Sequence, residues 1–236
     1  MFDLLDKISE IEAKLPGKTI WYRGHTNSSY KLLPTFYRLM SPPMEADLFY
    51  DYKNFSFGID SCTSDWEILL NMQHYGIPTR LLDWSWNLGT ALYFATLGNP
   101  KSSNIWLLSV HELNMASIDK NWILDTSAIS DTEEGENAKF TVYDLLTNKN
   151  SLIHPFAIEP AHSNRRISAQ RGTFTVHGSE KKAIEDIFPG LVQKVEIPDS
   201  DVKKVKKLLS SLGIDAFSVF PDNAGLAKYL KERYGY

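Results

Sequence analysis

Hydrophobic residues recur along most of the chain, and the spacing of their recurrence differs between segments. A period of three to four residues predicts helices, whereas short apolar or alternating runs predict strands. Helices are predicted at residues 3–15, 44–60, 65–74, 90–97, 200–213 and 225–233. Strands or extended pieces are predicted at residues 20–23, 30–37, 79–84, 104–110, 173–177, 191–197 and 216–220. The two kinds of segment mix without a regular alternation, so we predict an α+β fold with a mixed or antiparallel sheet core and packed helices.

The length and composition indicate a single domain. The chain has 236 residues, of which 43% are hydrophobic, and this is enough to build a substantial core. We predict one domain over residues 1–236, consisting of an N-terminal helix within residues 1–18 and a core over about residues 19–230.

Charge and cysteine content disfavour several classes of protein. The net charge of −4 argues against nonspecific binding of nucleic acid through bulk positive charge. The single cysteine, Cys62, excludes an intramolecular disulfide and fits a reducing compartment. Acidic residues interrupt the apolar positions of the N-terminus, unlike a signal peptide, and no apolar run approaches the roughly 20 residues of a membrane helix. We therefore expect a cytoplasmic protein with no membrane partner.

The stretch from Gln73 to Ala95 concentrates polar and aromatic groups that are costly to bury without a purpose. A predicted turn carries the polar groups and an apolar helix follows it, which is how a rigid scaffold presents a binding site. The candidate residues of this stretch are His74, Tyr75, Arg80, Asp83, Trp84, Ser85, Trp86 and Asn87. The alternative is a buried loop that contains an Arg80–Asp83 ion pair.

Arginines outside this stretch give two further candidates. Arg23 ends the predicted strand at 20–23, where a guanidinium is costly unless it is paired. It forms either a structural ion pair with an acid such as Asp83 or a bidentate contact with an anionic ligand. The second candidate is a local basic spot formed by Arg165, Arg166 and Arg171, for which the alternative is a solvated turn.

Several common catalytic signatures are missing from the sequence. The six histidines are scattered, so we expect no metal site. The sequence contains no phosphate-binding loop, no dinucleotide fingerprint and no nucleophile elbow. The remaining groups, which are arginines, aromatic rings, amides and hydroxyls, suit a ligand that carries both phosphate and a flat ring.

Three blocks of this sequence resemble the FRG domain family, which is named for an aromatic-Arg-Gly motif. The motif here is Tyr22-Arg23-Gly24. The second block runs from Gln73-His74-Tyr75-Gly76 through 79–84 to Ala91–Ala95, and the third contains Arg166-Ile167, Gln170, Gly172 and Phe174. A late segment, Phe220-Pro221-Asp222 with Gly225-Leu226-Ala227, also fits, so the resemblance extends from about Ile20 to Tyr229.

The chain is more distantly similar to ADP-ribosyltransferases, whose first strand also ends in an aromatic-Arg-Gly sequence. This resemblance implies a split sheet, NAD as the substrate and a phosphate-binding role for Arg23. It implies catalytic roles for Arg23, Asp83 and Gln170, and binding roles for Arg23, Gly24, His74, Tyr75, Arg80, Trp84, Ser85 and Tyr93. The third strand of such enzymes normally brings a glutamate, whereas the corresponding segment here, 170–175, begins with Gln170. Glutamine cannot place a negative charge beside a developing cation, so Asp83 or Glu159 would supply that charge.

The resemblance implies an ADP-ribosyltransferase-like enzyme that uses NAD to modify a macromolecule, either protein or nucleic acid. A toxin or phage-defence effector is the implied setting, with an antitoxin or regulatory protein as a partner. Two other readings stay open. One is a module that binds a nucleotide or nucleic acid without catalysis. The other is a nucleic-acid hydrolase that uses His74 and Arg80 as acid–base and phosphate-binding groups.

Overall fold

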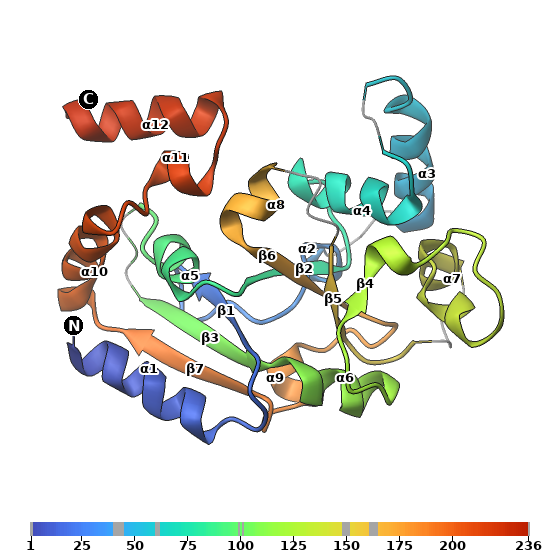
Figure 1. Cartoon of the computed structure of the whole chain (residues 1–236), viewed down its shortest axis with the longest axis horizontal. Helices are drawn as coiled ribbons and strands as arrows, with labels where there is room; N and C mark the ends of the chain where they lie inside the picture. Colours follow the sequence, from blue (N-terminus) through green and yellow to red (C-terminus); the bar gives the residue numbers. More distant parts are fainter. Residues whose placement is uncertain are drawn as a thin grey trace.

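A seven-stranded mixed sheet forms the centre of the molecule in the computed structural model, which describes residues 2–39, 45–59, 62–98, 100, 102–147, 152–160 and 165–235 (Figure 1). The strands are β1 (Ile20–His25), β2 (Leu81–Ser85), β3 (Ser103–Ser109), β4 (Leu124–Asp125), β5 (Phe156–Glu159), β6 (Gly172–Val176) and β7 (Val192–Ile197). They lie in the order β4-β5-β6-β2-β1-β3-β7. Every neighbouring pair is antiparallel except β4 and β5, which are parallel. The predicted α+β class is thus confirmed.

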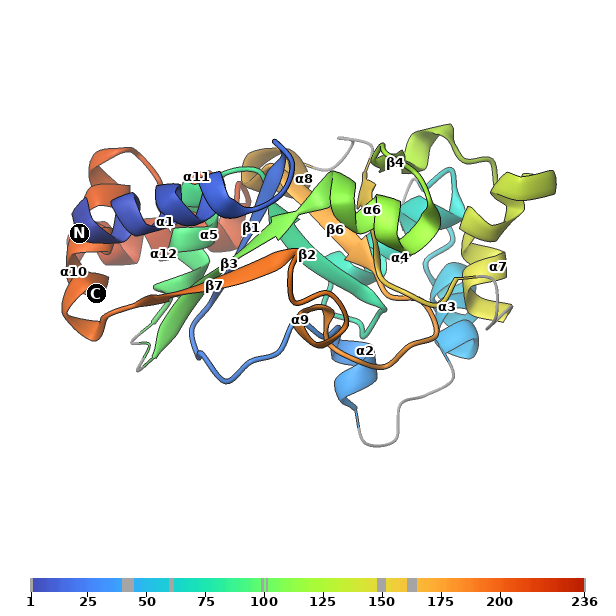
Figure 2. The same ribbon diagram turned by 90° about the horizontal axis from the view of Figure 1, so that it is seen from below.

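Helices cover the sheet in two groups. The longer helices are α1 (Phe2–Lys14), α3 (Glu45–Phe55), α4 (Asp65–His74), α5 (Leu88–Ala95), α6 (Val110–Ile118), α10 (Asp199–Ser211) and α12 (Asn223–Tyr234). The shorter ones are α2 (Thr35–Arg38), α7 (Val142–Thr147), α8 (Arg165–Gln170), α9 (Ile184–Ile187) and α11 (Ala216–Val219), with 3-10 turns at Thr126–Ala128 and Gly135–Phe140. Figures 1 and 2 show α1, α5, α10 and α12 at one end of the molecule and α3, α4 and α7 at the other.

The sheet is divided between β1 and β2. The β1–β3 ladder is continuous from Ile20↔Ser109 to His25↔Asn104, whereas β1 and β2 are joined at the single pair Tyr22↔Ser85. Beyond that pair the two strands separate. One half of the sheet is β1-β3-β7 and the other is β2-β6-β5-β4.

Gly24 allows α5 to lie directly on β1. A Cβ atom at this position would collide with the carbonyl oxygen of Ala91 and would lie 2.6 Å from the amide nitrogen of Ala95. Because both of these atoms belong to the α5 backbone, a larger residue could fit only if the helix moved away from the strand. The glycine of the aromatic-Arg-Gly motif therefore fixes the distance between β1 and α5, and with it the position of Arg23 next to that helix.

Two segments that were predicted to be extended contain short helices instead. Residues 30–37 end in α2, which begins after Pro34. Residues 216–220 contain α11, because the Asp215 carboxylate accepts hydrogen bonds from the backbone amides of Phe217 and Ser218 and forms a capping box. The helix predicted at 44–60 ends at Phe55, and residues 44 and 60 lie outside the described part of the chain. The helices α6 and α8 were not predicted.

Membrane-spanning helices and metal-binding clusters are both missing from the part of the chain that the structure describes. None of its helices combines the length and the apolar character needed to traverse a bilayer. Its His, Cys, Asp and Glu side chains form no group of three or more that could hold a metal ion.

A buried histidine predicts how stability depends on pH. His177 is completely buried, and burial, together with the charge of Arg80, lowers the pKa of its imidazole to about 3. Between about pH 6.5 and this value the unfolded chain binds a proton that the folded chain excludes, so the free energy of unfolding falls as the pH falls. The free energy of unfolding falls by about 1.4 kcal/mol for each pH unit within this window. We expect the wild type to lose about 2 kcal/mol more than His177→Leu between pH 6.5 and 5, as measured by urea unfolding. Equal losses in the two proteins would contradict this assignment.

Candidate functional site

A cavity of about 260 Å³ opens where β1 and β2 separate. We call it the β1–β2 cavity. It is lined by Tyr22, Arg23, Gly24, Gln73, Asp83, Trp84, Ser85, Thr90, Ala91, Phe94, Arg166 and Gln170. These residues come from β1, α4, β2, α5 and α8, so segments far apart in the sequence meet here.

Arg23 extends from β1 across the gap to β2. Its Nη1 donates a hydrogen bond to the backbone carbonyl of Asp83 and lies 3.4 Å from the Oδ2 atom of the Asp83 side chain. The Arg23 side chain is 20% exposed and that of Asp83 is 54% exposed. The ion pair is thus long and accessible to water, which makes it weak. The guanidinium therefore remains able to exchange this contact for an anionic ligand.

His25, which lies two residues further along β1, orients the Arg23 side chain. The Nε of Arg23 donates to the Nε2 atom of His25 at 3.0 Å. Burial, and then the charge of Arg23, lowers the pKa of His25 to about 3. The imidazole is therefore neutral at physiological pH and accepts the hydrogen bond from Arg23. This contact fixes the guanidinium beside β1, two residues before the strand ends at His25, and leaves its positive charge uncompensated.

A chain of three hydrogen bonds holds the carboxylate of Asp83. The backbone amide of Leu81 donates to the Oγ1 atom of Thr79 at 3.1 Å, so the Thr79 hydroxyl uses its own proton to donate to Oε1 of Gln73 at 2.6 Å. The Gln73 amide is thereby oriented with its Nε2 toward Asp83, and it donates to Oδ2 at 2.9 Å. Asp83 thus acts as an acceptor. Any ligand group that faces it must donate a hydrogen bond or carry positive charge.

The helix α8 supplies the opposite wall. The guanidinium of Arg166 lies over the ring of Phe220, 4.7 Å from its centroid. The backbone carbonyl of Gln170 accepts a hydrogen bond from Ser85 Oγ at 2.7 Å, and its side-chain Nε2 donates to the carbonyl of Val219 at 3.2 Å. After Gln170 the chain reverses through Arg171, which has a positive φ of 46°. Gln170 is therefore the last residue of α8, and its predicted position on a strand was wrong.

Six of the predicted site residues line the β1–β2 cavity: Arg23, Gly24, Asp83, Trp84, Ser85 and Gln170. Trp84 contributes to the wall while its Nε1 donates to Thr175 Oγ1 at 3.0 Å, so the indole is fixed. The anticipated contact between Arg23 and Asp83 is present, and it forms part of the cavity wall, so that the cavity next to it stays open.

Arg80 does not line this cavity. It therefore cannot make the predicted contact with a ligand bound there. Both Nε and Nη2 donate to Oε2 of Glu45, at 2.9 and 2.6 Å, and the two side chains are only 10% and 5% exposed. Burial alone would lower the pKa of Arg80, but the Glu45 carboxylate raises it above its ordinary value. The anticipated Arg80–Asp83 ion pair is replaced by this buried pair. The hydrolase reading thereby loses the phosphate-binding group that it assigned to Arg80.

The remaining predicted residues also lie outside the lining of the β1–β2 cavity. His74 is the last residue of α4, where its carbonyl accepts a hydrogen bond from Arg166 at 3.5 Å. Tyr75 follows it and is 63% exposed. Tyr93 faces a different cavity, on another side of α5. Glu159, the alternative carboxylate, ends β5 and does not line the β1–β2 cavity either.

Five lining residues were not predicted as site residues, and these are Tyr22, Gln73, Thr90, Ala91 and Phe94. Arg166 was predicted only as part of the basic spot. Gln73, Ala91, Phe94 and Arg166 all stand in the motif blocks of the sequence. The spacing of Thr90, Ala91 and Phe94 places them on one face of α5. Helical periodicity could therefore have identified this face in place of Tyr93.

The comparisons with known proteins concern the first part of the chain. The family model of the FRG domain matches residues 18–104, a range that contains Arg23, Gly24 and Asp83 and ends within β3. It confirms the FRG resemblance for this range. No curated protein and no solved structure matches the chain.

Proposed function

Because the chain carries an FRG domain at residues 18–104 and a cavity where its sheet divides, we propose that this protein is an ADP-ribosyltransferase-like enzyme that uses NAD to modify a macromolecule. The observation that carries the proposal is the convergence of Arg23, Asp83 and Gln170 on one cavity from three distant parts of the sequence. These are the residues that the resemblance assigned to catalysis.

In this proposal the arginines bind the pyrophosphate of NAD. Guanidinium groups form paired, charge-assisted hydrogen bonds with phosphate oxygens. Arg23 already presents Nη1 to an oxygen acceptor at the mouth of the cavity, and a phosphate oxygen would take the place of the long contact with the Asp83 side chain. Arg166 lines the same cavity and provides a second positive charge.

Asp83 would stabilise the reacting ribose. In ADP-ribosyl transfer the bond between the anomeric carbon and nicotinamide breaks, nicotinamide leaves with the electron pair, and a nucleophile of the target attacks that carbon and then releases its proton. Positive charge develops on the ribose during this step. Among the described residues that line the cavity, Asp83 supplies the one carboxylate, and Gln73 holds it as an acceptor. A fixed negative charge near the anomeric carbon lowers the barrier, which a neutral glutamine at position 170 cannot do.

The size of the cavity limits how NAD would bind. Pockets that enclose a whole small molecule measure roughly 300–1,000 Å³, and this cavity has about 260 Å³. It would accommodate the nicotinamide and its ribose, while the rest of the dinucleotide would extend over the surface. Arg165 and Arg171 are exposed on α8 and the turn after it. They could contact the phosphates of a nucleic-acid target; a protein target remains the alternative.

The biological setting belongs to the same proposal. We infer a toxin or phage-defence effector that acts in the cytoplasm, with an antitoxin or regulatory protein as its partner. The support for this setting is the resemblance to ADP-ribosyltransferases, together with the single cysteine, which fits a reducing compartment.

Incubation of the purified protein with labelled NAD and a cell extract tests the proposal, with mass spectrometry to locate the label. We expect ADP-ribose to be attached to a protein or a nucleic acid. Thermal stabilisation by NAD without its consumption would instead support a binding module, and cleavage of RNA or DNA without NAD would support a hydrolase. Either of these two outcomes would contradict the proposed transferase.

A further inference from the structure

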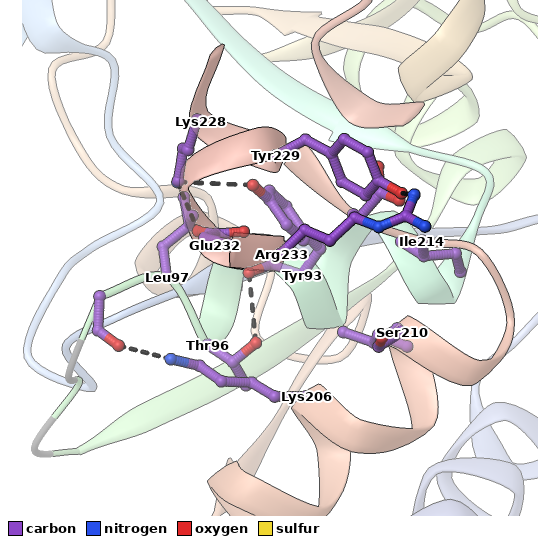
Figure 3. Close-up of a pocket in the computed structure, with 13 residues that line it drawn as sticks. Tyr93, Thr96, Leu97, Lys206, Ser210, Ile214, Lys228, Tyr229, Glu232 and Arg233 are labelled. Atoms are coloured by element: carbon purple, nitrogen blue, oxygen red, sulfur yellow. Dashed lines mark hydrogen bonds and ion pairs between the residues drawn. The ribbon is translucent and has the colours of Figure 1, made fainter. Parts of the chain in front are cut away.

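A second cavity lies on another side of α5 and measures about 680 Å³. Residues from α5, α10 and α12 converge on it, as Figure 3 shows. We call it the α12 cavity. The described residues that line it are all different from those that line the β1–β2 cavity. We propose that the α12 cavity binds a small organic phosphate that carries a flat ring, of the size of a nucleoside monophosphate.

Three cationic side chains reach this cavity from two helices: Lys206 on α10, and Lys228 and Arg233 on α12. Their present partners are mainly neutral oxygens. Lys206 donates to the carbonyl of Gly98 at 2.5 Å, and Arg233 donates to the hydroxyl of Tyr229 at 2.9 Å. A phosphate could accept hydrogen bonds from these groups without the separation of a strong ion pair.

The two carboxylates of the cavity cancel these positive charges only in part. The Asp215 carboxylate is occupied, because it accepts from the backbone amides of Phe217 and Ser218 at the start of α11. Glu232 lies 4.0 Å from Lys228, one helical turn away on α12, and both side chains are exposed, so this ion pair is weak. The three cations and two carboxylates leave one net positive charge around the space. This charge balance favours an anion over a cation or a neutral ligand.

The tyrosines provide both a hydrogen-bond donor and a surface for a ring. Tyr93 is only 9% exposed, and its hydroxyl accepts from Lys228 at 3.5 Å. Burial, followed by the charges of Glu232 and Asp215, raises the pKa of Tyr93 to about 12, so the hydroxyl keeps its proton and can donate to an anion. Tyr229 lines the same space, and Leu209 and Ile214 add apolar surface. Aromatic and aliphatic walls with a few donors are typical of sites for ring-containing ligands.

The volume agrees with this class of ligand. Small-molecule pockets measure roughly 300–1,000 Å³, and the α12 cavity falls in the middle of this range. The ring of the ligand would lie against Tyr93 and Tyr229, and its phosphate would face Lys228, Arg233 and Lys206. Inorganic phosphate alone would use only the second set of contacts and should therefore bind more weakly.

Titration calorimetry of the whole protein with 5′-AMP tests the inference. We expect Lys228→Met combined with Arg233→Met to weaken AMP binding at least about tenfold, because two charge-assisted contacts are lost. Lys231→Met is the matched control, since Lys231 lies on α12 but does not line the cavity. It should bind AMP like the wild type, and so should Arg23→Ala. Ser210→Tyr, which fills the cavity from an exposed position on α10, should also weaken binding and gives a second test if the double variant unfolds.

Three results would overturn the inference: no binding of millimolar AMP to the wild type, wild-type affinity in the folded double variant, or loss of binding in Arg23→Ala. The last would assign AMP to the β1–β2 cavity. Because the titration requires no turnover of NAD, its outcome is independent of whether the protein transfers ADP-ribose.

Discussion

Replacement of Arg23 by alanine should reduce kcat/KM for the proposed ADP-ribosyl transfer by about 10²- to 10³-fold, the range found when one preorganised donor is removed from an active site. Arg23 contributes a guanidinium that is fixed by His25 and exposed to the β1–β2 cavity. Arg23→Lys should also be impaired, because an ammonium group cannot form the paired contact with phosphate. Initial rates with labelled NAD provide the measurement.

Arg171→Ala is the control for this experiment. Arg171 is exposed and does not line the cavity. Arg171→Ala should therefore change kcat/KM for NAD less than Arg23→Ala does. Arg23→Ala should still unfold near the wild-type temperature, because its partner Asp83 is half exposed. Asp83→Asn should lower kcat more than it raises KM, since the lost charge acts on the transition state. Full activity of folded Arg23→Ala would exclude the proposed role of Arg23.

Substitution of Glu45 by alanine should destabilise the protein by about 3–5 kcal/mol, because it leaves the guanidinium of Arg80 buried without a counter-charge. Glu45 accepts from the backbone amide, Nε and Nη2 of Arg80 at 3.1, 2.9 and 2.6 Å. For a chain of this length the melting temperature should fall by roughly 6–20 °C. Glu45→Gln keeps an oxygen acceptor and should lie between alanine and the wild type. Urea unfolding measures the free energy directly.

The exposed pair Lys31–Asp186 provides the comparison. The Nζ atom of Lys31 lies 3.0 Å from Oδ1 of Asp186, but the two side chains are 57% and 49% exposed. Asp186→Ala should therefore lower the free energy of unfolding by less than about 1 kcal/mol. Similar losses in the Glu45 and Asp186 variants would show that burial adds nothing to the Arg80–Glu45 pair.

The parts of the fold that local sequence determines could be predicted. The apolar strand before Arg23 and the helix at Asp65–His74 follow from spacing and capping alone. The helix α11 was missed because a four-residue element has no periodicity to detect. Its signal was the Asp215 cap and the reciprocal contact from Ser218. Short elements of this kind depend on single hydrogen bonds more than on hydrophobic pattern.

The members of the candidate site could be predicted only where the position of a residue in its strand or helix determines which way its side chain points. Arg23 was identified because a charge on an apolar strand needs a partner, and Asp83 because it was one such partner in a stretch rich in polar groups, although β1 continues two residues beyond Arg23. Tyr93 was misplaced because one residue along a helix corresponds to a rotation of about 100°, so that Phe94 lines the β1–β2 cavity and Tyr93 the other. The partner of Arg80 could not be predicted either, since Glu45 is 35 residues away and only tertiary structure brings them together.

The two halves of the sheet are interleaved along the chain, and this has a consequence for protein synthesis. β2 follows β1, β3 returns to the first half, and β7 completes that half only at Ile197. Gln170 additionally needs the carbonyl of Val219 as its acceptor. A ribosome that builds the chain from its N-terminus must therefore release it as far as Val219 before every wall of the β1–β2 cavity is in place. The proposed activity would therefore begin only after both halves of the sheet and α11 have folded together.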